Sequence, residues 1–140
     1  MNYIGTKDIS ERREIDYENG VKIPQNALEK FKIAPQNSTL LCIEGGSAGR
    51  KVGFLEHSVC FGNKLCCFEP VFVAPKFVYF YLQNSHFLDE FNGSMTGIIG
   101  GVGKDKIEKF LIPLPPLKEQ EFIAQSLERL FAISKGLKSE

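Results

Sequence analysis

Cysteine and histidine are the side chains of this 140-residue chain most suited to nucleophilic or metal chemistry. Four cysteines occur, none in a CxxC pair, at Cys42, Cys60, Cys66 and Cys67, and the two histidines are His57 and His86. A catalytic cysteine needs a histidine and an orienting carboxylate beside it. His57 precedes Cys60 by three residues, which on a strand would put the two side chains on opposite faces. We therefore interpret the cysteines as reduced, buried residues of a cytoplasmic protein, with a zinc site as the minor alternative.

Two glycine-rich stretches resemble phosphate-binding loops. In residues 97–105 (GIIGGVGKD), five residues rather than four separate the outer glycines, and Asp105 stands where a Ser or Thr would bind magnesium. Residues 44–51 (EGGSAGRK) are followed by a strand-like run, whereas a phosphate loop needs a helix there. The second stretch instead predicts a tight turn between antiparallel strands, with Arg50 and Lys51 as exposed cations. We expect no catalytic residue, no bound metal and no cofactor.

The elements that would position these residues are strand-like up to about residue 74. Short runs of Val, Phe, Cys and Leu, bounded by turn residues, predict strands over 38–43, 51–55 and 59–68. Residues 25–31 lie between Pro24 and an Ala-Pro break, and they predict a short helix. Cys66 and Cys67 are neighbours in the last strand, so we expect them to point to opposite faces.

A helix is predicted over residues 75–91, because Pro75 suits the first helical position and Asn92-Gly93 suits the end. Seven residues recur on one side at helical spacing: Phe77, Phe80, Tyr81, Asn84, Phe87, Leu88 and Phe91. An aromatic stripe could stack bases, but a helix must bury such a stripe to be stable, so we favour a core face. A glycine-rich connection (93–103) and a strand or short helix (107–114) follow.

The last predicted helix runs over residues 117–136 after two prolines. Its seam steps by four, three, four and three residues through Ile123, Leu127, Leu130, Ser134 and Leu137, with Phe122 and Phe131 beside it. This heptad-like pattern is typical of helices that pair with another helix. The chain supplies no obvious partner for it, so we expect a docking surface and a possible homodimer through this helix.

Composition places the chain among ordinary globular proteins, with 43% apolar and 24% charged residues. The first twenty residues mix both signs without an apolar core, so we expect no signal peptide, and no run is long enough to span a membrane. Seventeen basic residues balance seventeen acidic ones, so no global positive field indicates nucleic acid. Residues 21–51 nevertheless carry five cations against two acids, a modest local excess.

One segment carries a more specific signal. Residues 112–120 (IPLPPLKEQ), followed by FIAQSLERL at 122–130, resemble the junction that closes each recognition domain in type I restriction–modification specificity subunits. Other motifs resemble that family in the same order along the chain: YIGTKDI (3–9), NSTLLCI (37–43), GSAGR (46–50), Asn63 before a strand ending in Pro70, YFYL (79–82) and residues 97–107. The resemblance covers essentially the whole chain.

The resemblance implies an α+β fold, in which a β-rich target-recognition globule with one packed helix (1–115) precedes a coiled-coil-type spacer helix (116–140). It also implies a non-catalytic, cytoplasmic protein that reads one half of a split site in double-stranded DNA. Methyltransferase subunits, which hold S-adenosylmethionine, would dock on it, and a motor-nuclease subunit would join for restriction.

The sequence departs from the family pattern in three ways. The Gly-Asp pair before the hairpin strand is Asn37-Ser38 here, the strand that usually precedes residues 3–9 is absent, and one recognition domain is present instead of two. We therefore interpret the chain as a half-subunit, a fragment or a product of rearrangement. Two-fold pairing of such half-subunits would require a palindromic split site.

Candidate DNA contacts follow from residue type. Lysine and arginine bind phosphates, whereas small polar residues reach bases or the backbone. The cations are Arg50, Lys51, Lys64, Lys104 and Lys106, and the polar candidates are Ser47, Asn63 and Thr96. The alternative is a protein–protein module without DNA binding, which the zero net charge favours. An enzyme that uses the glycine loops and a cysteine is the third hypothesis, and it would require substrate turnover that is lost in Cys60→Ser.

Overall fold

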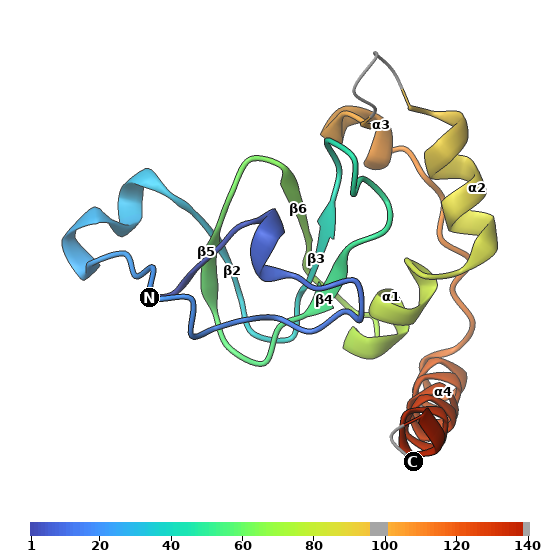
Figure 1. Ribbon diagram of the computed structural model, residues 1–140. Coiled ribbons are helices and arrows are strands. Elements are labelled where there is room, and N and C mark those ends of the chain that lie inside the picture. Colours follow the sequence, from blue (N-terminus) through green and yellow to red (C-terminus); the bar gives the residue numbers. More distant parts are fainter. Residues whose placement is uncertain (96–100, 139–140) are drawn as a thin grey trace.

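The computed structural model describes residues 1–95 and 101–138, with side chains as far as residue 134. Its strands form two three-stranded sheets (Figure 1). The first has the order β1 (Tyr3–Ile4), β5 (Val59–Phe61), β2 (Lys32–Ala34), and the second has the order β4 (Val52–Phe54), β3 (Thr39–Cys42), β6 (Leu65–Phe68). The β1–β5 pair is parallel, and the other three pairs are antiparallel.

Strand β3 lies at the centre of the second sheet, and all four of its residues are buried. Successive side chains of a strand point to opposite faces, so β3 contributes to two cores. Leu40 belongs to the core that includes Ile4 of β1 and Val59 of β5, whereas Leu41 packs with the helices that follow β6. A strand buried on both faces reads as a continuous apolar run, which is why residues 38–43 were predictable.

The single strand predicted over residues 59–68 is wrong, because β5 and β6 belong to different sheets. The chain turns between them, where the Leu65 N–H donates to the Gly62 carbonyl at 3.1 Å. Gly62-Asn63 is a turn-forming pair, but apolar residues on both sides hide it in the sequence. The expectation for the adjacent cysteines is confirmed: Cys66 lies in the helix-side core and Cys67 packs against the other core.

The single helix predicted over residues 75–91 is two helices, α1 (Pro75–Tyr81) and α2 (Ser85–Gly93). Asn84 ends the continuity because its side chain accepts the His86 N–H at 2.7 Å, the bond that an N-cap residue makes. The prediction that the aromatic stripe faces the core is confirmed, since Phe77, Phe87 and Phe91 are buried. The α+β class is therefore confirmed, with two packed helices in place of one.

The helical turns η1 (Thr6–Asp8) and η2 (Gln25–Lys30) are short 3-10 segments, and η2 confirms the helix expected after Pro24. Helix α3 (Lys104–Ile107) ends where a strand or short helix was expected to begin. Residues 108–116 form neither helix nor strand. This extended segment contains the prolines, whose fixed φ and missing N–H disfavour the backbone hydrogen bonds of both helices and strands.

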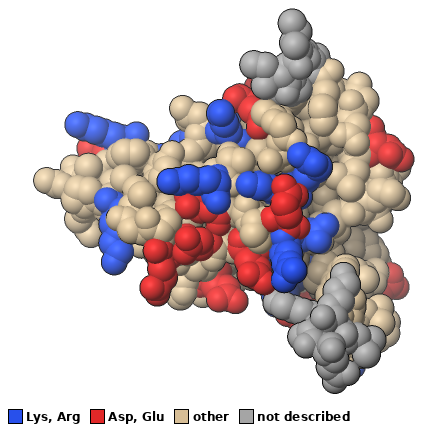
Figure 2. Space-filling model, viewed as in Figure 1, with Lys and Arg blue, Asp and Glu red and all other residues tan. Residues whose placement is uncertain are grey.

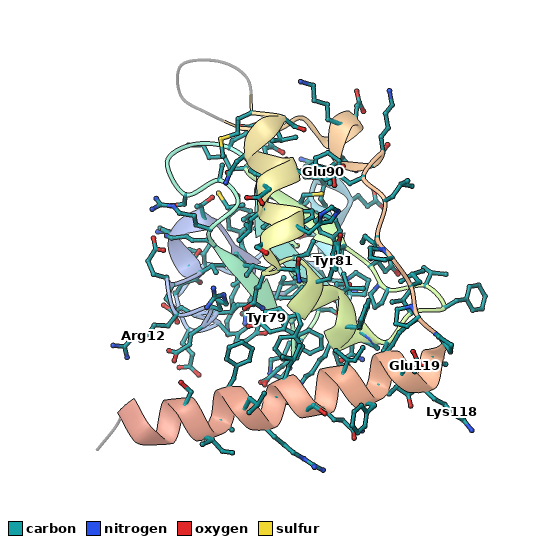
Figure 3. The ribbon with its side chains drawn as sticks, turned by 90° about the vertical axis from the view of Figure 1, so that its right-hand side faces the viewer. Arg12, Tyr79, Tyr81, Glu90, Lys118 and Glu119 are labelled. Carbon is teal, nitrogen blue, oxygen red and sulfur yellow. The ribbon has the colours of Figure 1, made fainter. Side chains whose placement is uncertain are left out.

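Helix α4 (Leu117–Lys138) is confirmed, starting at the predicted residue. The expectation that the chain supplies no obvious partner for this helix is wrong for one of its sides, because α4 lies along α1 of its own globule (Figure 3). Lys76 of α1 forms an ion pair with Glu128, and the Phe80 and Phe131 rings stack with centroids 5.6 Å apart. Within the described residues, no helix combines the length and apolar character that a bilayer crossing requires.

Candidate nucleic-acid interface

Three segments that are distant in sequence meet at one end of the β4–β3–β6 sheet. The Ile43 N–H donates to the Lys64 carbonyl at 2.9 Å, and the Val102 N–H donates to the Ile43 carbonyl at 2.9 Å. Glu44 and Gly101 form an antiparallel bridge. These backbone bonds hold residues 44–51, 62–64 and 101–106 together, and we call this set the loop edge. It lies at the end of the molecule away from α4 (Figure 1).

Glycine is required at two positions of the loop edge. Gly49 has φ +77°, and a Cβ there would lie 2.8 Å from the Phe91 ring of α2. At Gly101, which has φ +141°, a Cβ would lie 2.9 Å from the Ile43 carbonyl oxygen. Positive φ is costly for other residues, and backbone atoms cannot move aside easily. Gly49 therefore lets the loop pack against the Phe91 ring, and Gly101 lets two backbone segments approach one another.

Seven of the eight predicted DNA-contact residues, Lys51 among them, lie on the loop edge with at least part of their surface accessible. Arg50, Asn63, Lys64, Lys104 and Lys106 are exposed, and Ser47 is half-buried. The Arg50 guanidinium donates to the Gly46 carbonyl, and Lys106 Nζ approaches the Ser94 carbonyl at 3.5 Å. Among the described residues, none of these cations forms an ion pair with a carboxylate, so their charges are available to an anion. Thr96 lies outside the described residues.

Lys51 differs from the expectation. It is half-buried rather than an exposed cation, and its ammonium donates to the Thr6 carbonyl at 3.2 Å. Thr6 is 45 residues away in sequence, so the local pattern could not reveal this contact. Arg50, its neighbour, remains exposed as expected.

The charge around the loop edge is mixed in sign. Exposed Glu44, Asp105 and Glu108 alternate with its cations along the chain. Figure 2 shows lysine and arginine interspersed with aspartate and glutamate over one face of the molecule. Because charges of both signs alternate here, their fields largely cancel at a distance. Salt screens what remains, so attraction of a polyanion to this surface would act only at short range.

No nucleophilic centre forms from the cysteines in the described part of the chain. Burial raises the pKa of the Cys60 and Cys66 thiols above the ordinary value, which disfavours the reactive thiolate. His57 is exposed, and its ring lies edge-on to the Tyr17 ring, with the ring centroids 5.0 Å apart. The same residues contain no group of three or more His, Cys, Asp or Glu side chains that could hold a metal ion.

The structure also contains a cleft that the sequence did not predict. It has a volume of ≈ 820 Å³ and lies between the loop at residues 11–14, helix α1 and the second half of α4. Aromatic side chains and charges of both signs line it, among them Arg12, Tyr79, Phe80 and Glu128. Its lining comes from four separate segments, so no sequence motif could mark it.

The predicted helix seam divides between two environments. Leu130 and Ile123 are 62% and 37% exposed, Leu127 is half-buried, and the side chain of Leu137 lies outside the described set. Phe131, expected only to flank the seam, stacks on Phe80 of the globule. Four exposed apolar residues share one side of the helix at helical spacing, Phe122, Ile123, Leu130 and Ile133, and we call them the outer stripe. Leu117 and Phe131 are also exposed but lie on other sides of α4.

Comparisons with known proteins agree with this architecture. The family model of the type I restriction modification DNA specificity domain matches residues 1–140. A chain from a structural study of complex assembly and conformational transition of the type I R-M system has 14% identity and a TM-score of 0.76. The HsdS subunit from Thermoanaerobacter tengcongensis has 16% identity and a TM-score of 0.74. Each alignment covers 98% of this chain and 37% of the solved chain, so this chain spans little more than a third of their length. No curated protein gives a significant match.

Proposed function

Because this chain belongs to the type I restriction–modification DNA specificity domain family, we propose that it reads one half of a split site in duplex DNA. The observation that carries the proposal is the family match over the whole chain. The fold of the chain is also similar to that of solved chains from type I systems. The loop edge supports it, because exposed loops held on a rigid sheet are suited to reaching base edges in a major groove.

The proposed division of labour separates recognition from spacing. Residues 1–115 would form the recognition domain, and residues 116–140 would form the spacer helix. The boundary is supported by the change from the extended proline segment to α4 at Leu117. Catalysis would reside in partner subunits: methyltransferase and motor-nuclease subunits would carry out the chemistry, and this chain would recognise the DNA sequence.

On the loop edge, we assign phosphate contacts to the exposed cations Arg50, Lys64, Lys104 and Lys106. Phosphate contacts fix the register of a protein on the duplex, whereas base contacts specify the sequence. Ser47, Asn63 and Thr96 are the candidates for base or backbone contacts, and Thr96 lies outside the described residues. Lys51 would have to release the Thr6 carbonyl before it could reach a phosphate.

The outer stripe is the proposed contact with a second spacer helix. In a dimer of this chain, the stripe would pair with its copy about a two-fold axis, and the two loop edges would read inverted half-sites. A split, palindromic target follows from that symmetry.

Binding to random-sequence duplex DNA over a range of salt concentrations tests the proposal, with and without a methyltransferase partner. A DNA reader should weaken steeply as salt rises, because bound phosphates release their counterions. The triple change of Arg50, Lys64 and Lys104 to Ala should abolish most of the affinity. A matched triple, Lys22, Lys30 and Lys118 to Ala, removes exposed cations away from the loop edge and should change little.

A protein–protein module without DNA binding is the second candidate. The balanced charge and the exposed outer stripe favour it. If the chain shows no affinity for duplex DNA at low salt, either alone or with a methyltransferase partner, the protein–protein module is favoured over the DNA-reading domain.

A further inference from the structure

Gln120 is a buried amide at the start of α4, and only 3% of its surface is exposed. Its Oε1 accepts the Ala74 N–H at 3.0 Å, and its Nε2 donates to the Pro115 carbonyl at 2.8 Å. Ala74 is the N-cap residue of α1, whereas Pro115 belongs to the extended segment that leads into α4. One side chain therefore links the starts of two helices, through a bond between residues that are 46 positions apart in the chain.

Glutamine suits this position because it carries a donor and an acceptor on one planar group. Each bond satisfies a backbone group that secondary structure leaves without a partner. An apolar side chain of the same length would fill the space, but it would orphan both groups. Water would then have to enter to satisfy them.

A second contact lies farther along α4, where Glu128 meets Lys76 and Phe131 stacks on Phe80. Two contact points on a rigid rod fix its direction. Phe131 is eleven residues from Gln120, so the baseline between them is about 16 Å at ~1.5 Å per residue. The first point thus controls the tilt of α4 about the second.

We propose that Gln120 is a positioning residue that fixes the direction of α4 relative to the recognition globule. Given the proposed function, on which this consequence rests, Gln120 also sets the gap between the two half-sites that a pair of chains would read. Figure 3 shows α4 running beneath the globule, with Lys118 of its first turn directed away from it.

The geometry gives the size of the effect. One water admitted at Gln120 separates the contact by roughly 2.8 Å, the diameter of the usual probe sphere. Over the ~16 Å baseline, that separation is a tilt of about 10°. A 22-residue helix is ~33 Å long, so its ends would shift relative to one another by about 6 Å. The rise between base pairs is about 3.4 Å, so the preferred gap should change by one or two base pairs.

Distances in solution test the positioning directly. Spin labels on unnatural amino acids at exposed Lys118, Lys30 and Asp89 avoid the native thiols. Gln120→Met should shift or broaden both distances from Lys118 by about 3 Å, one water diameter. The Lys30–Asp89 distance within the globule reports that the fold is retained. Gln125→Met is the same substitution at an exposed site of α4 and should change no distance. Unchanged distances in Gln120→Met would overturn the proposal.

A second variant distinguishes hydrogen bonding from packing. In Gln120→Glu, the protonated carboxyl can both donate and accept, whereas the carboxylate can only accept and would face the Pro115 carbonyl. Distances from Lys118 should be those of the parent at about pH 5 and shifted at about pH 8, since burial favours the neutral form at the lower pH. The same distances at both pH values would contradict the hydrogen-bond mechanism.

Selection from random-sequence duplexes then tests the consequence for DNA. The parent should enrich two half-sites with a defined gap, and Gln120→Met should enrich the same half-sites with a changed or broadened gap. An unchanged, sharp gap would refute the role of Gln120 in spacing. Failure of the parent to enrich any duplex would refute the proposed DNA function instead, and the distance measurements would still decide the role of Gln120.

Discussion

Truncation of Leu130 on the outer stripe should weaken self-association of this chain without unfolding it. Leu130 is 62% exposed in the single chain, and its neighbours Ile123 and Ile133 on the stripe are exposed as well. A two-fold contact that covers the stripe would bury Leu130 once in each copy. The perturbation is Leu130→Ala, which keeps a good helix former at the position.

The magnitude follows from the exposed fraction. Leu→Ala removes about three carbon groups, worth roughly 0.8 kcal/mol each when buried. At 62% exposure, about 1.5 kcal/mol is available from each copy, or about 3 kcal/mol from the pair. A change of ~1.4 kcal/mol is tenfold, so the dimer dissociation constant should rise roughly 100-fold.

Sedimentation equilibrium of the parent and the variant measures this constant, and urea unfolding should show nearly equal stability for the monomers. Leu111→Ala is the matched control, because Leu111 is an exposed leucine outside α4 and its truncation should leave association unchanged. The reasoning is refuted by a parent that stays monomeric at high concentration, or by equal weakening in both variants.

Three further predictions concern the loop edge and the core. Lys104→Ala should lower the slope of log affinity against log salt by about 0.9, the effect of one lost phosphate contact, whereas Lys118→Ala on α4 should leave the slope unchanged in a binding titration. Phe91→Ala should cost about 3–5 kcal/mol in urea unfolding, because the ring is fully buried, while Phe72→Ala, at a site 97% exposed, should cost almost nothing. Cys66 is buried and burial raises the pKa of its thiol, so alkylation at neutral pH should be slower in the folded chain than in the urea-unfolded chain. Equal labelling rates in the two states would contradict this.

Local signals were read correctly where a few neighbouring residues decide the outcome. The start of α4 follows Pro115-Pro116, and its apolar periodicity persists to its end, so both were visible in the sequence. Strand β3 was also predictable from local sequence, because burial on both faces leaves a continuous apolar run. The break between α1 and α2 also has a local signal at Asn84, but the helical spacing of the surrounding aromatics outweighed it.

Pairing between distant segments could not be read in this way. The apolar run over residues 59–68 contains no sign that β5 joins β1 and β2 while β6 joins β3. Lys51 and Arg50 are adjacent and alike in charge, yet one is bound to the Thr6 carbonyl and the other is exposed. Loop residues of the candidate interface were identified by type, whereas their meeting at one edge depends on backbone bonds among Ile43, Lys64 and Val102.

By itself, the sequence determined the family, the α+β class and the proline junction that begins the last helix. The family and the fold class that it implies rest on motifs that follow one another along the whole chain. The proline junction depends on residue types within a few positions, where φ preferences and periodicity act. The tertiary structure alone decided that α4 lies along α1, which side of α4 stays exposed, and that Gln120 joins Ala74 to Pro115. Those outcomes depend on which surfaces meet after the chain has folded, and packing between segments tens of residues apart leaves no periodic trace in the order of the amino acids.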